Sequence, residues 1–373
     1  MADSYTCELH MGLVASHVPP VLPLSVDLET KRVLKKLASA HRALAELKGA
    51  AGLVPNEAIL INTLSLQEAK DSSAIENIVT THDDLYRSDD VANRFASVAA
   101  KEVYAYARAL REGFQKIRET GLITINDILA MQATLEQNQA GFRRLPGTAL
   151  KNDKTGEVVF TPPQSYEEIA SLMANLEAFL NGGLDVDLDP LVKMAVIHHQ
   201  FETIHPFYDG NGRTCRILNI LYLVKEGLLG TPVLYLSRYI NQNKADYYRL
   251  LQAVRTDGVW EEWLIYMLDG VEQTAGQTTR LVHRIRDLML DHKVRMRREL
   301  PRIYSQDLLN NMFSHPYSKI AFVERDLGVS RITATRYLDE LTRIGLMRKH
   351  KLGRESYYMN RALLDLLGNV QAV

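Results

Sequence analysis

Cysteine is nearly absent from this chain of 373 residues, which contains only Cys7 and Cys215. Two cysteines at this distance do not suggest a disulfide framework, so a reducing cytoplasm is the expected location. No apolar run approaches the length that spans a membrane. The N-terminus also lacks the basic and apolar regions of a signal peptide. We therefore expect no membrane partner.

Net charge is also nearly absent, because 44 basic and 45 acidic residues give a formal charge of -1. Such a chain has no global basic field, so any contact with DNA would need a local patch. We find no fixed-period repeat and no low-complexity segment. The content of 46% hydrophobic and 24% charged residues is typical of a globular protein. The length allows roughly two or three domains.

Most of the chemical information lies in the twelve residues from His205 to Arg216, which read HPFYDGNGRTCR. The proline makes the turn after the histidine rigid. The glycines stand where a loop enters a helix, which the apolar run from Ile217 to Val224 predicts. A helix start presents unpaired N–H groups, and glycine lets the backbone approach a ligand closely. This junction therefore predicts an anion site.

The charged side chains of the same stretch fit a nucleotide polyphosphate. Arg213 and Arg216 are three residues apart, so both guanidiniums can point at one anion. Two arginines are unfavourable at a helix N-terminus, and a polyphosphate supplies a reason for them. Asp209 offers a hard oxygen ligand for Mg²⁺, and His205 offers a base. The alternative is a histidine loop with two surface arginines, which the coincidence of independent features disfavours.

The string resembles the signature of the Fic family, His-x-Phe-x-(Asp/Glu)-Gly-Asn-Gly-Arg-x-x-Arg, and matches it at every fixed position. The family consists mostly of protein adenylyltransferases, which move AMP from ATP to a Ser, Thr or Tyr hydroxyl of a protein. The resemblance implies that His205 is the catalytic base and that Asp209 holds Mg²⁺. The residues of the signature that it implies for ATP binding are His205, Gly210, Asn211, Gly212, Arg213, Thr214, Cys215 and Arg216.

Individual roles follow from the same resemblance. Asn211 and the N–H groups near the two glycines would steady the α-phosphate, while the two arginines would hold the β- and γ-phosphates. Cys215 stands where the family often has a small residue, and we expect it to be tolerated because that position varies. The family's base pocket is closed by the segment after the signature, which places Tyr239, Gln242 and Tyr248 near the adenine. The alternative for the two tyrosines is core packing.

A short upstream segment has two interpretations. Ser73 and Glu76 fit a capping box at the start of a helix. Many Fic proteins instead carry an inhibitory helix with Ser/Thr-x-x-x-Glu-Gly/Asn, and Ser72, Glu76 and Asn77 match that pattern. The resemblance implies that Glu76 pairs with Arg216 and competes with the γ-phosphate of ATP. We favour the inhibitory interpretation, which also places Glu76 in the ATP site.

One β-hairpin interrupts the helical patterns. Residues 148–161 form two strand-like runs about a turn between Asp153 and Gly156. The hairpin is either a structural trim or the Fic flap, which holds the target segment by main-chain pairing over the active site. We favour the flap, and expect the hydroxyl-bearing segment of the target to dock along it.

The other patterns predict helices. They favour helices over 28–47, 56–69 and 83–118, and the last has an apolar stripe of Val91, Phe95, Val98, Val103, Tyr106 and Leu110. The proline-rich first 26 residues are expected to be extended over the surface. A helix over 189–203 delivers His205. A metal cluster of His198, His199, His205 and Asp209 is disfavoured, because adjacent helical histidines point in different directions.

The C-terminal region resembles a winged helix. Helices are predicted over 320–327 and 331–344, followed by two strands about a turn at Gly353. Its basic residues that could meet phosphates are Arg331, Arg336, Arg343, Arg348, Lys349, Lys351 and Arg354. Because Asp339 and Glu340 lie on the same helix, we favour packing or partner docking over DNA binding.

Together these patterns predict a mostly α fold, in which a Fic-type helical bundle with one β-hairpin flap precedes a C-terminal winged helix-turn-helix domain. The expected parts are an N-terminal helical segment (1–120) with the inhibitory helix at about 70–80, a catalytic core (121–275), a connector helix (276–303) and the winged-helix domain (304–373). The predicted function is an autoinhibited, homodimeric protein adenylyltransferase that uses ATP and Mg²⁺. The alternatives are phosphotransfer or AMP removal on the same scaffold, or a nucleotide-sensing transcription regulator. The target protein is not identifiable from the sequence.

Overall fold

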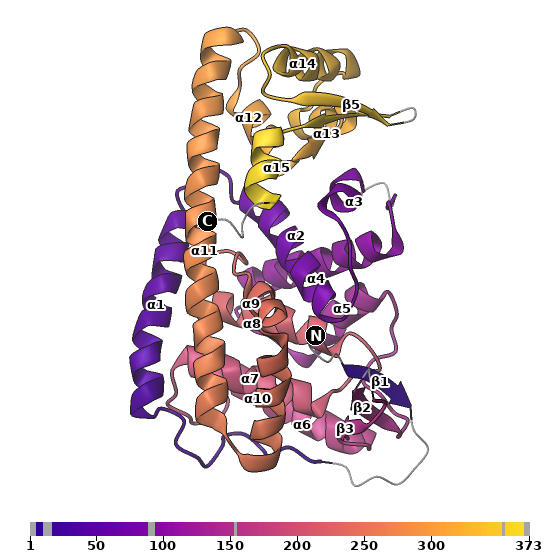
Figure 1. The fold of residues 1–373 in the computed structure, drawn as a ribbon, viewed down its shortest axis with the longest axis vertical. Helices are drawn as coiled ribbons and strands as arrows, with labels where there is room; N and C mark the ends of the chain where they lie inside the picture. Colours follow the sequence, from indigo (N-terminus) through magenta and orange to yellow (C-terminus); the bar gives the residue numbers. More distant parts are fainter. Residues whose placement is uncertain (1–4, 10–16, 89–93, 153–154, 353–354, 369–373) are drawn as a thin grey trace.

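The computed structural model describes residues 5–9, 17–88, 94–152, 155–352 and 355–368. The mostly α fold expected from the sequence is confirmed, with helices gathered along one long helix, α11 (Trp260–Glu299) (Figure 1). Helix α1 (Lys31–Ala51) packs along α11, and Lys36 joins the two helices by ion pairs with Asp269 and Glu272. Among the described residues, no helix has both the length and the apolar composition to cross a membrane.

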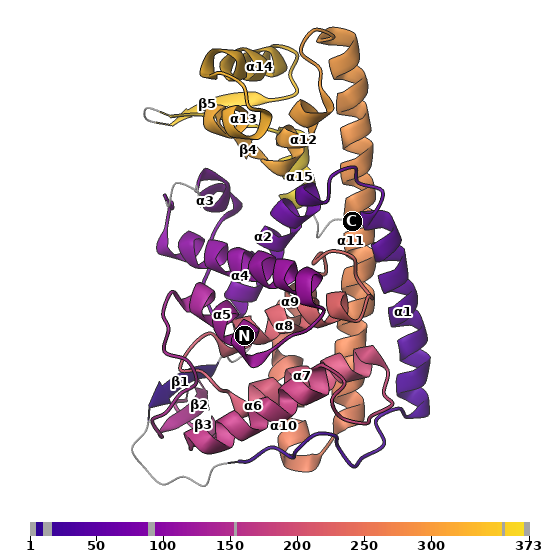
Figure 2. The same cartoon turned by 180° about the vertical axis from the view of Figure 1, so that it is seen from behind.

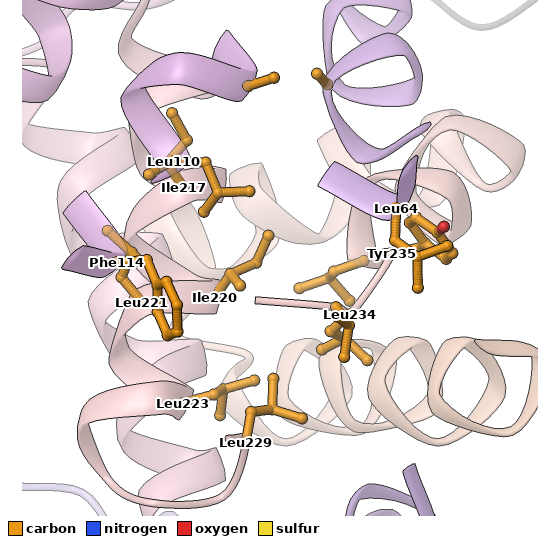
Figure 3. Packing of buried hydrophobic residues seen from close by; sticks show 14 of the residues in the cluster. Leu64, Leu110, Phe114, Ile217, Ile220, Leu221, Leu223, Leu229, Leu234 and Tyr235 are labelled. Atoms are coloured by element: carbon orange, nitrogen blue, oxygen red, sulfur yellow. The ribbon is translucent and has the colours of Figure 1, made fainter. Parts of the chain in front are cut away.

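Helix α8 lies at the centre of the bundle. Its neighbours are α2 (Glu57–Ile75), α4 (Val98–Thr120), α5 (Ile125–Glu136) and α7 (Pro190–Ile204), with α6 (Tyr166–Leu180), α9 (Leu236–Gln242) and α10 (Lys244–Asp257) further out. Every residue from Ile217 to Leu223 of α8 (Asn211–Lys225) is buried, as in a helix covered on all sides. Figure 3 shows Leu221 beside Phe114 of α4. At Gly113 a Cβ atom would lie 2.6 Å from Cδ1 of Leu221, so glycine permits this close approach.

The long helix predicted over 83–118 is wrong. The structure has a short helix α3 (His82–Arg87) and a separate α4 that starts at Val98. Ser97 begins α4, because its side chain accepts a hydrogen bond from the N–H of Ala100. Val98 is 76% exposed and does not belong to the predicted apolar stripe, while Val91 lies outside the described residues.

The expected hairpin is present but is not alone. Strand β2 (Thr148–Asn152) pairs antiparallel with β3 (Val158–Phe160), and the expected turn residues 153–154 lie outside the described part of the chain. A third strand, β1 (Tyr5–Leu9), pairs antiparallel with the other edge of β2. The N-terminal segment was expected to be extended over the surface, but these five residues form a strand of the sheet.

The expected boundary between the catalytic core and the connector helix, at residues 275 and 276, lies inside α11, which is one continuous helix there. The C-terminal region follows α11. Its elements are α12 (Gln306–Ser314), β4 (Tyr317–Ser318), α13 (Ile320–Leu327), α14 (Arg331–Arg343), β5 (Arg348–Leu352), β6 (Glu355–Met359) and α15 (Arg361–Gly368). The strands form a sheet of order β4-β6-β5. Gly353 and Arg354 lie outside the described residues. This region and the sheet β1–β3 lie at opposite ends of the molecule (Figures 1 and 2).

Candidate active site

The turn that carries His205 is fixed by its own backbone. His205 ends α7 in the left-handed conformation, with φ 49° and ψ 59°, and its N–H donates to the carbonyl of Phe201. Asn211 bridges the turn, because its amide accepts from the N–H of Phe207 and donates to the carbonyl of Phe207, both at 2.8 Å. These two bonds shape the loop and use one of the two N–H donors of the Asn211 amide, and Asn211 also lines the cavity, so its contact with the α-phosphate stays a prediction.

Arg143, which the sequence analysis did not single out, holds the same turn from outside. It is 1% exposed, and its Nε donates to the carbonyl of His205 at 2.7 Å. Its Nη2 donates to the carbonyl of Pro163 at 2.5 Å, just after β3 at the base of the hairpin. The Arg143 N–H donates to the carbonyl of Pro206. One buried guanidinium thus ties the base of the hairpin to the histidine turn. Its place beside the hairpin is a weak sequence signal.

The imidazole of His205 is held neutral. Burial, with the positive charges of Arg143 and Arg255, lowers its pKa to about 3. A neutral imidazole has a nitrogen that accepts a proton, so the side chain is in the form that a general base requires.

The start of α8 is open to a ligand. Gly210 occupies the cap position with φ 74°, and because it has no side chain it cannot itself accept a cap hydrogen bond there. A Cβ atom at Gly210 would overlap Oε1 of Glu136, and one at Gly212 would lie 2.6 Å from Oε1 of Glu76 and 2.8 Å from Nη1 of Arg216. The positive φ of Gly210 favours glycine, and a Cβ atom at Gly212 would have to displace the charged end of Glu76 or Arg216. The backbone N–H groups and the helix dipole favour an anion here.

Glu76 lies between the two arginines of the signature. Its Oε1 accepts from Nη2 of Arg216 at 2.7 Å, and its Oε2 lies 2.7 Å from Nε of Arg213. The Nε of Arg216 also donates to the hydroxyl of Ser72 at 2.7 Å. The capping-box interpretation of Ser73 and Glu76 is wrong, because this segment is the last turn of α2 and not the start of a helix.

Helix α2 is anchored so that this last turn faces α8. The buried carboxylate of Glu68 accepts hydrogen bonds from the hydroxyl and the N–H of Ser237 and from the hydroxyl of Tyr106. Burial raises the pKa of Glu68 to about 7. Asp71 pairs with Arg238 at 3.1 Å. These contacts with α4 and α9 fix the rotation of α2 about its axis.

Arg213 is surrounded by carboxylates. Its Nη1 donates to Glu102 at 3.2 Å and its Nη2 lies 2.9 Å from Glu136, in addition to Glu76. Burial raises the pKa of Glu136 to about 7 in spite of the charge of Arg213, with smaller contributions from the charges of Asp209, Glu76 and Glu102. An arginine held by three acidic groups is strongly fixed in place.

Two hollows meet at Glu76 and Asp209. The first, of about 290 Å³, is lined by Glu76, Asn77, Leu150, Glu202, His205, Tyr208, Asp209, Gly210, Asn211, Gly212, Arg216, Tyr247, Tyr248, Leu251 and Arg255. The second, of about 500 Å³, lies beside Arg213 and is also lined by Glu76 and Asp209. The structure thus brings His205 and Arg216 to one cavity, and Glu76 stands between that cavity and Arg213.

Two predicted ATP contacts of the signature lie away from the cavity. Thr214 and Cys215 are fully buried on the core side of α8, and Cys215 Sγ donates to the carbonyl of His198. The helix turns by about 100° per residue, so neighbours of Arg213 and Arg216 face other directions. Thr214 and Cys215 are not among the residues that line either hollow.

The predicted adenine contacts divide in the same way. Tyr248 lines the first cavity, whereas Tyr239 and Gln242 are not among its lining residues. The ring of Tyr239 packs against Tyr266 at 5.1 Å and over Gly270 of α11. Residues of α10 that the sequence analysis passed over take their place on the cavity wall, namely Tyr247, Leu251 and Arg255.

The two histidines before the signature have structural partners. His198 contacts the hydroxyl of Tyr247 through Nε2 at 2.8 Å and the amide of Asn219 through Nδ1 at 2.6 Å. Possible ligand atoms of His198, Glu202 and Cys215 lie within 4.8 Å of one another. Both nitrogens of His198 are already engaged, so this group serves the core and we assign it no metal.

Three family models match the chain. The description "Fic/DOC family N-terminal" covers residues 34–115, and "Fic/DOC family" covers residues 119–223. The third, "Protein adenylyltransferase SoFic-like, C-terminal domain", covers residues 288–363. These matches include Ser72 to Asn77, the signature and most of the region after α11.

Similar proteins include a probable protein adenylyltransferase of Aquifex aeolicus, 28% identical over 186 residues, which are 48% of this chain and 54% of that protein. A protein adenylyltransferase of Caenorhabditis briggsae is 34% identical over 107 residues, 28% of this chain and 20% of that protein. The chain thus spans about half, or less, of these relatives. A Fic family protein of Desulfovibrio desulfuricans has the same fold, with a TM-score of 0.54 at 19% identity, over 90% of this chain and 97% of that one. By the signature, the fold and the family matches, the chain belongs to the Fic/DOC family.

Proposed function

We propose that the protein transfers AMP from ATP to a Ser, Thr or Tyr hydroxyl of a protein. The observation that carries the proposal is the carboxylate of Glu76, held by Arg213 and Arg216 at the start of α8, with His205 on the same cavity. A carboxylate held by two guanidiniums occupies a position that suits a phosphate group. Curated relatives named as protein adenylyltransferases support the same activity.

In the proposed reaction, the hydroxyl oxygen of the target attacks the α-phosphorus of ATP and His205 takes the hydroxyl proton. The bond between the α-phosphorus and the oxygen that bridges to the β-phosphate breaks, and pyrophosphate leaves. The low pKa of His205 keeps its accepting nitrogen free of a proton at neutral pH. Such transfer depends mainly on positioning and charge stabilisation, for which the open start of α8 and the buried Arg216 are suited.

Asp209 would hold Mg²⁺ beside the phosphates. Its side chain is 76% exposed and lies on both hollows, and a single carboxylate next to phosphate oxygens is a usual donor set for this ion. Gln132 donates to the Asp209 carbonyl at 3.3 Å, and the Asp209 side chain accepts from the N–H of Gly210, so the loop position is fixed. The bound ion would offset the negative charge of the leaving pyrophosphate.

We further propose that Glu76 inhibits the enzyme. Its carboxylate occupies both guanidiniums and separates the first cavity from the hollow beside Arg213. A nucleotide with its γ-phosphate near Arg216 would have to displace it. Withdrawal of Glu76 would join the two hollows, and the phosphate tail could then reach Arg213.

The hairpin is our candidate for the target dock. Leu150 of β2 lies on the cavity that also contains His205. An extended segment paired along residues 148–161 would therefore pass close to the imidazole. Main-chain pairing of this kind places a hydroxyl without demanding much sequence from the target.

The direct test is incubation of wild type, Glu76→Gly and Glu76→Gly/His205→Ala with labelled ATP and a cell extract, followed by mass spectrometry of labelled proteins. We expect AMP on protein hydroxyls, most in Glu76→Gly and none above background in the double variant. A gain of phosphate instead would assign the scaffold to phosphotransfer, and a phosphocholine mass on unlabelled proteins, drawn from a choline-bearing nucleotide of the extract, would assign it to that transfer. Loss of AMP from labelled proteins would indicate the reverse activity.

A nucleotide-sensing transcription regulator is the second candidate. The exposed face of α14 carries Arg331, Ile332 and Arg336, which suits a macromolecular contact. However, Lys349 pairs with Asp339 at 2.9 Å on this domain, which leaves less positive charge for phosphates. A salt-dependent gel shift with one operator sequence would support DNA binding, and its absence at low salt would count against it.

We also propose that the protein is a cytoplasmic homodimer. The low cysteine content supports the location, and the resemblance to the family supports the dimer. Light scattering of the full chain at several concentrations measures its mass. A monomer mass throughout would remove the dimer from the proposal.

A further inference from the structure

The outer edge of the hairpin is already occupied by the chain itself. Strand β1 pairs antiparallel with β2 along five residues, from Tyr5 opposite Asn152 to Leu9 opposite Thr148. Because the other edge of β2 pairs with β3, β2 is the central strand of the sheet. An external segment therefore finds no unpaired edge on β2 in this state.

The register puts β1 beside the active site. Cys7 stands opposite Leu150, and Leu150 lines the cavity that contains His205. An extended target paired with β2 would take this same register position. Strand β1 therefore occupies the edge of β2 in the extended, antiparallel geometry that the proposed function requires of a docked target.

The chain is also held near the far strand of the hairpin. His17 donates its N–H to the carbonyl of Thr161 at 2.9 Å, and its ring packs on Phe160 at 5.6 Å. The guanidinium of Arg255, a cavity residue, lies 3.9 Å from the centre of the Phe160 ring on the same strand. The N-terminal segment is thus attached on both sides of the hairpin, and only residues 10–16 connect the two attachments.

We propose that β1 is a cis-acting occupant of the target dock, which an extended strand of a partner protein must displace. The inference rests on the proposed function only for the identity of the dock. Pairing within one chain acts at an effective concentration of order millimolar, so a free segment at micromolar concentration competes poorly. Glu76 blocks the phosphate side of the site and β1 blocks the hydroxyl side, so the two restraints act on different substrates.

Alternation of the ladder supplies a matched pair of variants. In an antiparallel pair, successive residues direct their N–H groups alternately toward and away from the partner strand. Proline removes an N–H, and an edge strand tolerates it only where that N–H faces away. Of Thr6→Pro and Cys7→Pro, one therefore breaks the ladder with β2 and the other leaves it in place.

The probe is a fluorescent synthetic peptide with the sequence of residues 1–10, and the readout is its anisotropy with the full chain. We expect weak binding to wild type, and binding tighter by about tenfold or more to one proline variant and to a chain lacking residues 1–9. Thermal melting checks that each variant is folded. Equal affinity of the peptide for wild type, both proline variants and the shortened chain would overturn the proposal.

Labelled ATP separates this inference from the proposed function. In the Glu76→Gly background, opening the edge should raise AMP transfer to the added peptide or to other proteins. AMP on Tyr5 or Thr6 of the intact chain would also support β1 in the dock, as a substrate. If the anisotropy differs as expected while no variant transfers AMP, the dock stands and the proposed reaction fails. If AMP transfer occurs but peptide affinity is the same for all variants, the proposed reaction stands and the role of β1 in the dock fails.

Discussion

The Oε1 atom of Glu76 lies 2.7 Å from Nη2 of Arg216, although 140 positions separate the two residues in the sequence. The contact joins the last turn of α2 to the first turns of α8. It places a carboxylate at the helix start where the proposed reaction needs the tail of ATP. If Glu76 inhibits the reaction as proposed, the strength of inhibition depends on how firmly α2 is held against the bundle.

Replacing Glu76 with glycine should raise AMP transfer. The side chain makes charge-assisted contacts with two buried guanidiniums, and each contact is worth about 1.5–3 kcal/mol. If ATP no longer has to displace even one of them, the rate of AMP transfer at limiting ATP should rise about tenfold or more. Initial rates with labelled ATP measure the effect. Glu102→Gln is the control, since Glu102 contacts Arg213 but not Arg216, and it should change the rate little. Equal rates for wild type and Glu76→Gly would reject the inhibitory role.

Replacing His205 with alanine should lower turnover by about 10²–10⁴, the usual contribution of a general base. Because burial lowers the pKa of His205 to about 3, the ring stays neutral from pH 5 to pH 8. The rate of Glu76→Gly should therefore show no loss from protonation of His205 in that range. His283→Ala, on α11 and away from the cavity, should leave turnover unchanged. A rate that halves near pH 6.5 on acidification would contradict a neutral His205.

Arg143→Lys should lower kcat by about hundredfold while ATP affinity changes little. A lysine cannot reproduce the fork that holds the carbonyls of His205 and Pro163, so the imidazole loses its position. Comparison of kcat with the dissociation constant of ATP, in the Glu76→Gly background, separates positioning from binding. The neighbouring exposed Arg144→Lys is the matched control. A fall in ATP affinity with kcat intact would argue against a positioning role.

Gly210→Ala should destabilise the fold more than Gly227→Ala. Both glycines have positive φ values, 74° and 69°, so alanine costs about 1–2 kcal/mol at each. A Cβ atom at Gly227 meets nothing within 4 Å, whereas one at Gly210 overlaps the Glu136 carboxylate that holds Arg213. Urea unfolding should show an additional loss of about 1 kcal/mol or more for Gly210→Ala. Equal losses would indicate that Glu136 moves without cost.

Glu68→Gln should change how stability depends on pH. The folded-state pKa of about 7 lies above the usual value of 4.5, so between these values the native chain keeps a proton that the unfolded chain has lost. The contribution of Glu68 to stability therefore falls as pH rises from about 4.5 to 7, by about 3 kcal/mol in all. Glutamine has no such ionisation, so the unfolding free energy of wild type relative to the variant should fall across this window. A constant difference between pH 5 and pH 8 would contradict a buried, protonated Glu68.

Local patterns gave correct expectations wherever neighbours along the chain carry the physics. The apolar run after Gly212 predicts a helix because residues three and four apart share a face, and that helix is α8. The turn residues near Gly156 predict the hairpin of β2 and β3, because a short turn brings two strands that are adjacent in the sequence side by side. Where a helix begins is less certain, because the cap at Ser97 competes with a continuous periodic pattern, and the single helix expected there is in fact two.

The sequence by itself determined the chemistry of the loop from His205 to Arg216, because spacing along one helix start fixes which groups can face one anion. Only the tertiary structure decided that Glu76 lies between both arginines, that Arg143 holds the histidine turn and that β1 occupies the hairpin edge. Each of these contacts joins residues far apart in the chain. Their geometry depends on how whole helices and strands pack against one another. The periodicity of residues within one helix or strand does not predict that packing.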